Sequence, residues 1–145
     1  NPMKKAEVRN KVGQAQKRLF ADPKYRTQWL ATRRRHPNKF EELILKWIET
    51  ANLPFRFVGD WTFWIGPGPS GKHRNPDFIH QSEKKAILAH GRFWHKDEQI
   101  EEELKDYQAC GWNCLIVFDQ PLPTEMEFTK QVKLFIGLKS HPLNQ

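Results

Sequence analysis

The sequence predicts a mixed α/β domain of the α+β kind, a mixed sheet flanked by helices, with a basic helical extension at its N-terminus. Three observations predict this class. The run NCLIVF at 113–118 has the apolar, β-rich composition of a central strand. Segments 40–51, 97–109 and 125–138 repeat their apolar residues at helical spacing. The order helix, three or four strands, helix, strand, helix is typical of a sheet with helices on its faces.

Length and composition indicate one folded domain with a short appendage. The chain has 145 residues, of which 38% are hydrophobic and 12% aromatic, enough to bury a real core. Its longest apolar run, 115–118, is far too short to span a membrane, and its N-terminus lacks the apolar stretch of a signal peptide. Cys110 and Cys114 do not demand a disulfide, so we expect an intracellular location.

Basic residues concentrate at the front of the chain. Residues 1–39 contain twelve Lys or Arg against two acids, a net +10, so the remainder carries −3 of the total of +7. A phosphate-binding arm on a catalytic core would have this distribution, and so would a solvated basic helix. We divide the chain into a basic helical extension, 1–39, and a main domain, 40–145. The start at Asn1-Pro2 indicates a piece cut from a longer chain.

The extension is predicted to hold two helices. Apolar positions at helical spacing predict the first over 3–20, and Asp22-Pro23 ends it. A second, shorter helix is predicted over 24–34, and His36-Pro37 interrupts the chain again.

The main domain begins with the most strongly patterned helix, which Asn38 caps and Pro54 closes. Its core-facing residues are Phe40, Ile44, Trp47, Ile48 and Ala51. Strands are predicted at 55–58 and 61–65, followed by a Gly- and Pro-rich loop over 66–75 and a strand at 77–79. Further along, 84–90 predicts a strand, 97–109 a helix that Gly111 stops, 113–118 the central strand and 125–138 a closing helix.

Four residues with suitable chemistry fall within nineteen positions: Asp77, His80, His90 and His95. They lie on or just beyond two predicted strands. A carboxylate at one strand start and imidazoles at the end of a neighbouring strand would hold a divalent cation and a proton-transfer group together. Phosphodiester hydrolysis needs both. Taken singly, Asp77 also fits a turn cap and each His a core or edge residue.

The segments Asn75-Pro76-Asp77-Phe78 and His90-Gly91-Arg92-Phe93-Trp94-His95, separated by a strand, resemble the core of the very-short-patch-repair-like (Vsr-like) endonucleases. The resemblance extends in order over roughly residues 40–120. It includes Phe40-Glu41 at a helix start, Leu53-Pro54-Phe55-Arg56 at the first strand, and Cys110-Gly111-Trp112-Asn113 before Leu115-Ile116-Val117.

This resemblance implies a restriction-endonuclease-like core fold and cleavage of double-stranded DNA with Mg²⁺. It implies that Asp77 binds the metal directly and that Ala89 offers its backbone carbonyl. Glu41 would order water at the edge of the site. His90 and His95 would transfer protons to or from the attacking water and the leaving oxygen.

The related homing endonucleases with an EDxHD pattern suggest a second mapping. In it Glu41 and Asp77 fill the first two places, His80 is the His, and Ala89 stands where the final Asp is expected. The Ala at this position is either natural drift or an inactivating substitution, and we favour the second interpretation.

A second departure concerns zinc. The repair enzymes bind a structural zinc through a Cys before the FWH turn and further His and Cys residues after it, whereas this chain has Arg92 and Lys96-Asp97-Glu98. We expect no structural zinc, which argues against a dedicated mismatch-repair role. That role also uses aromatic side chains that insert into the DNA, and Trp61 and Trp64 are the candidates here.

The basic extension resembles the linker of a homing endonuclease from a phage or mobile-intron setting, which places the protein in the cytoplasm of a bacterial or phage-infected cell. Predicted DNA contacts are Arg33, Arg34 and Arg35 in the extension, Lys72 and Arg74 in the loop, and Arg92. We expect no membrane partner, and the pattern shows no dimer seam. The alternatives are a mismatch-specific nicking enzyme, a non-catalytic DNA-binding module on the nuclease fold, and an RNA-binding protein that uses exposed aromatics.

Overall fold

The computed structural model describes residues 2–25, 36–92 and 96–137. Contacts divide the chain into two units, Asn1–Arg34 and Arg35–Gln145. The described part of the first unit is helix α1 (Pro2–Phe20) followed by a helical turn at 23–25. Most of the second predicted helix, 26–34, lies outside the described residues. No helix in the described ranges combines the length and hydrophobicity that crossing a membrane requires.

The larger unit is built on a four-stranded mixed sheet, with the strands in the order β1-β2-β3-β4. Strands β1 (Arg56–Phe57), β2 (Phe78–His80) and β3 (Lys85–His90) are antiparallel neighbours. Strand β4 (Asn113–Phe118) runs parallel to β3 and follows the crossover helix α4 (Asp97–Ala109). The predicted mixed sheet with flanking helices is therefore confirmed.

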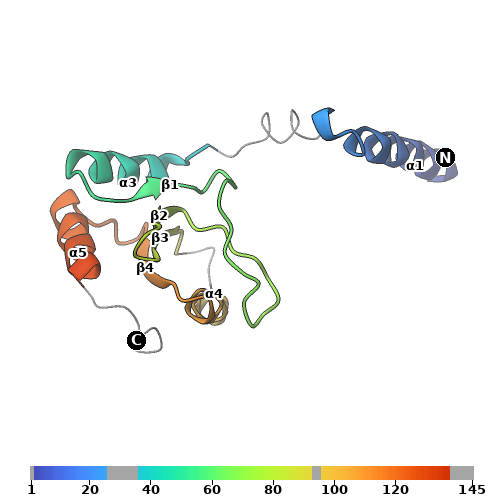
Figure 1. Ribbon diagram of the computed structural model, residues 1–145. Coiled ribbons are helices and arrows are strands. Elements are labelled where there is room, and N and C mark those ends of the chain that lie inside the picture. The colour runs from blue at the N-terminus through green and yellow to red at the C-terminus, as the bar shows by residue number, and fades with distance from the viewer. Residues whose placement is uncertain (1, 26–35, 93–95, 138–145) are drawn as a thin grey trace. The chain divides into compact units, whose positions relative to one another are not determined.

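Helices cover both faces of this sheet (Figure 1). Helices α3 (Lys39–Thr50) and α5 (Glu125–Gly137) pack on one face around a buried cluster that includes Ile44, Trp47 and Phe128. Helix α4 covers the other face, where Tyr107 packs with Ile79 and Leu88. Along β3 the side chains alternate between these faces. Ile87 and Ala89 contact the α3–α5 cluster, whereas Ala86 and Leu88 belong to the α4 cluster.

Helix α3 begins where its sequence predicts. The side chain of Asn38 accepts a hydrogen bond from the Glu41 N–H at 2.8 Å, and the Glu41 carboxylate accepts one from the Asn38 N–H at 3.0 Å. This reciprocal capping box satisfies two backbone donors that the first helical turn otherwise leaves unpaired.

The predicted strand at 61–65 is wrong. The chain turns at 59–62, where Trp61 adopts a left-handed backbone (φ 68°), and only Ile65 pairs, in an isolated bridge to Arg74. The side chain of Thr62 bonds to Asp60, and the Trp64 indole donates to the Trp61 carbonyl at 3.0 Å. The aromatic residues here resemble a strand in composition, but local side-chain hydrogen bonds favour a turn.

Candidate active site

Asp77 is held at the junction between the Gly-rich loop and β2. Its side chain is 9% exposed, and its Oδ2 accepts a hydrogen bond from the Ala89 N–H at 2.7 Å. Its backbone carbonyl accepts from Val58 N–H at 2.8 Å and from Gly59 N–H at 3.2 Å. These contacts fix the carboxylate to the neighbouring strand and to the turn after β1.

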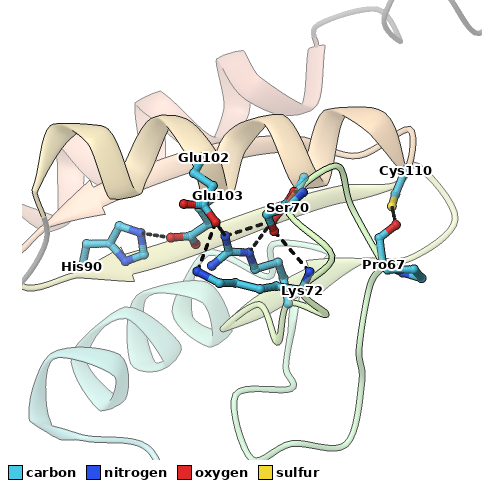
Figure 2. Close-up of polar contacts among 9 residues, drawn as sticks. Pro67, Ser70, Lys72, His90, Glu102, Glu103 and Cys110 are labelled. Atoms are coloured by element: carbon cyan, nitrogen blue, oxygen red, sulfur yellow. Dashed lines mark hydrogen bonds and ion pairs between the residues drawn. The ribbon is translucent and has the colours of Figure 1, made fainter.

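His90 ends β3 beside Asp77. Because β2 and β3 are antiparallel, with Phe78 opposite Ile87, the start of β2 lies next to the end of β3. Both side chains belong to the α4 face, since His90 alternates with Ala89 and Asp77 alternates with Phe78. The ring of His90 is buried and points toward α4, where its Nε2 lies 3.2 Å from Oε2 of Glu103 (Figure 2). That is an ion-pair distance when the imidazole is protonated.

These residues line a cavity of about 300 Å³ between the sheet edge, the Gly-rich loop and α4. Its ionisable lining residues are Asp77, His90, Glu103, His73, Arg74 and Tyr107. Tyr107 is 1% exposed, and its burial, then the charges of Glu103 and Asp77, raise the pKa of its phenol. The hydroxyl therefore stays protonated at neutral pH.

Two of the sequence-predicted catalytic residues lie away from this cavity. His80 ends β2, and by strand alternation it faces the side opposite Asp77, where its ring meets the edge of Phe55 at a centroid distance of 5.8 Å. Glu41 belongs to α3, which packs on that same opposite face. Glu41 is 1% exposed and takes part in the capping box. Neither residue lines the cavity.

Ala89 contributes to the cavity wall, but its side chain packs against the α3–α5 cluster. The backbone at this position is therefore what meets Asp77, through the N–H described above. A carboxylate at position 89 would lie on the face of the sheet opposite Asp77.

The predicted DNA-contacting residues have varied environments. Arg33, Arg34, Arg35 and also His95 lie outside the described residues. Lys72 is exposed and pairs with Glu102 at 3.1 Å, and Arg74 is 20% exposed in a buried ion pair with Asp106 at 2.9 Å. The Arg92 guanidinium lies 4.4 Å from the ring centre of Phe118 and donates to the Gln120 carbonyl. Arg92 is thus tied to the segment that follows β4.

Sequence reasoning missed Glu103, Tyr107 and His73. The helical period could have indicated the first, because positions 103 and 107 are one turn apart on the helix predicted at 97–109. His73 gave no such signal, since its place at the cavity depends on how the loop folds over α4.

The donor set fits a hard divalent cation that keeps most of its waters. Asp77 and Glu103 supply carboxylate oxygens to one cavity, and Mg²⁺ is commonly held by only one or two carboxylates. Across the described ranges, no three His, Cys, Asp or Glu side chains form a ready-made metal-binding group. In the same ranges both cysteines are free thiols.

Comparison of the chain with protein-family models, with curated proteins and with solved structures finds no match.

Proposed function

We propose that the chain is a Mg²⁺-dependent DNA endonuclease with a restriction-endonuclease-like core of the Vsr-like type. The observation that carries the proposal is the meeting of Asp77 and His90 at the edge of two neighbouring strands, in one cavity with Glu103. A fixed carboxylate beside a paired imidazole is the combination that hydrolysis of a phosphodiester requires. The resemblance to Vsr-like enzymes assigns Asp77 to the metal and His90 to proton transfer, and this supports the same activity.

The charge of the cavity supports a cation as part of the site. Two acidic side chains, Asp77 and Glu103, line it, and Asp106 pairs with one edge of the Arg74 guanidinium. A DNA phosphate close to Asp77 and Glu103 would be repelled by them unless a cation lay between. Asp77, with the Ala89 carbonyl that the resemblance assigns, would hold Mg²⁺. When bound, the ion would neutralise charge on the scissile phosphate.

The remaining residues have roles that follow from their contacts. Glu103 holds the imidazole of His90 through Nε2, at a distance of 3.2 Å. In the neutral imidazole, with Nε2–H directed at Glu103, Nδ1 would be the atom that accepts a proton from the attacking water. Tyr107 keeps its proton and offers a neutral hydroxyl in the same cavity. Leu88 and the buried ring of Tyr107 limit the access of bulk water.

Within the nuclease class we favour the homing-endonuclease type. The net charge of +10 in residues 1–39 suits a linker that follows the DNA backbone. The positions that would bind a structural zinc in the repair enzymes are occupied by Arg92 and Lys96-Asp97-Glu98.

The test is metal-dependent cleavage of supercoiled plasmid by the chain and by Asp77→Asn. We expect nicking that needs Mg²⁺ and that the Asp77→Asn protein loses by at least about a hundredfold. The substitution keeps the shape of the side chain, so an unchanged thermal unfolding curve establishes that the loss is chemical. Equal cleavage by both proteins would refute the proposal.

Ala89→Asp decides whether the alanine disables the enzyme. Because the side chain at 89 faces the α3–α5 cluster, we expect the substitution to lower stability and not to raise cleavage. Cleavage by Ala89→Asp alone would instead show an enzyme disabled at this position. Duplex binding without cleavage by either protein would favour the non-catalytic binding module.

Cleavage assays on matched and mismatched duplexes separate the homing type from the repair type. Preference for single-stranded RNA over duplex DNA would indicate the RNA-binding alternative.

A further inference from the structure

The loop over 66–75 forms one wall of the cavity and is fastened to α4 by a single buried carboxylate. Asp106 is 2% exposed. It accepts hydrogen bonds from the Ser70 N–H at 2.9 Å, from the Ser70 hydroxyl, and from Nε of Arg74 at 2.9 Å. A buried carboxylate is stable only when its oxygens are paired in this way.

The loop is shaped to receive this side chain. A Cβ placed on Gly68 would overlap the Asp106 side chain, so only glycine permits the approach. The two hydrogen bonds from Ser70 and the pair with Arg74 outweigh burial and hold the pKa of Asp106 below its usual range. Asp106 is therefore a carboxylate at neutral pH, and its charge is available to Arg74.

Asp106 also sets the direction of the Arg74 side chain. Nε and Nη2 of Arg74 both lie 2.9 Å from Oδ2 of Asp106, and Nη2 lies 3.5 Å from Oε1 of Glu102. A guanidinium has five N–H donors, and these contacts use Nε and Nη2. The two N–H donors on Nη1 take no part in these contacts. Arg74 lines the same cavity as Asp77 and His90.

We propose that Asp106 is a positioning residue that acts through Arg74. It fastens the loop to α4 and holds the Arg74 guanidinium so that its remaining donors bind a DNA phosphate at the cavity. A guanidinium is the side chain best matched to phosphate oxygens, and one held in place loses less freedom when it binds. The inference rests on the proposed function for the identity of the ligand, a duplex DNA phosphate.

A double-mutant cycle on duplex binding tests this role. The four proteins are wild type, Asp106→Asn, Arg74→Ala and the double variant. Binding to a fluorescein-labelled duplex is measured by anisotropy with Ca²⁺ in place of Mg²⁺. We expect each single variant to weaken binding about tenfold. We expect the double variant to bind no more weakly than Arg74→Ala, because the effect of Asp106 on DNA binding is proposed to pass through that side chain.

Glu101→Gln is the matched control. It changes the same charge on the same helix, at an exposed pair with Lys105 at 3.3 Å. We expect it to bind as the wild type does. Ser70→Ala serves if Asp106→Asn unfolds, since it removes one of the hydrogen bonds by which Asp106 fastens the loop that carries Arg74. We expect Ser70→Ala to weaken binding only while Arg74 is present.

The outcomes separate this inference from the nuclease proposal. Additive losses in the cycle would overturn the positioning role, and so would a wild-type protein that does not bind the duplex. Coupled losses in a protein that binds DNA without cutting it would support the positioning role while refuting the nuclease proposal.

Discussion

Glu41 combines a structural contact with a predicted chemical role. Its Oε1 completes the capping box of α3, yet a cap needs no buried charge, and the side chain is only 1% exposed. Burying a carboxylate costs free energy that a neutral Gln in the same cap would not cost. Because Glu41 packs on the face opposite the cavity, however, its position supports the capping contact, and the catalytic role stays a prediction of the resemblance.

Glu41→Gln and Asn38→Ala separate the two roles. Gln at this position still completes a capping box, and Glu41 does not line the cavity, so we expect the unfolding temperature and plasmid cleavage both to change little. A fall in cleavage at an unchanged unfolding temperature would instead support the role that the resemblance assigns. Asn38→Ala removes the cap and should lower the free energy of unfolding by about 1 kcal/mol with cleavage retained. Unchanged cleavage by Glu41→Gln would assign Glu41 to the cap alone.

Gly59 lies against the carboxylate that the proposed chemistry needs. A Cβ at this position would stand 2.7 Å from Cε2 of Phe57 and 3.3 Å from Oδ1 of Asp77. We expect Gly59→Ala to displace Asp77 and to slow cleavage by about tenfold to a hundredfold. Gly137→Ala is the control, because nothing lies within 4 Å of its Cβ position. Equal rates for both variants would show that Asp77 tolerates the shift.

At the scale of elements, a buried lysine on the sheet holds the end of a helix. Lys85 begins β3 and is 2% exposed, and its Nζ donates to the carbonyls of Phe135 at 3.0 Å and Ile136 at 2.8 Å. The last carbonyls of a helix have no partner within the helix, and an ammonium group there also complements its dipole. Lys85 thus joins α5 to the sheet.

Lys85→Met tests this connection. The apolar stem is kept, but two charge-assisted hydrogen bonds are lost, so we expect the free energy of unfolding to fall by about 3 kcal/mol. Urea denaturation followed by tryptophan fluorescence measures it, with Lys84→Met at the exposed neighbouring position as the control. A loss no larger than that of the control would mean that α5 does not depend on Lys85.

The length and order of most elements could be predicted because their patterns are local. The predicted strands at 84–90 and 113–118 and the helix at 97–109 correspond closely to β3, β4 and α4. Residues 61–65 were the exception, because the turn at Trp61 depends on side-chain bonds that hydrophobic patterning does not report.

At the scale of the whole molecule, charge is the feature that bears on DNA binding. Arg33, Arg34 and Arg35 belong to the stretch that carries the net +10. Changing all three to Gln should weaken binding to every duplex alike, because phosphate contacts carry no sequence information. In a plot of log binding constant against log salt concentration, the magnitude of the slope should decrease by about 3, close to one for each charge removed. A changed preference among sequences would refute the assignment to phosphates.

By itself the sequence determined the mixed sheet, the capped helix α3, and the position of Asp77 before one strand and His90 at the end of another. These follow from periodicity and turn chemistry, which act between residues close in the chain. Only the tertiary structure decided which side chains share the cavity. Strand alternation places His80 on the far face, and packing of α4 over the near face brings Glu103 to His90. Helical spacing can place Glu103 one turn from Tyr107, but the meeting of Glu103 with His90 depends on how α4 packs on the sheet.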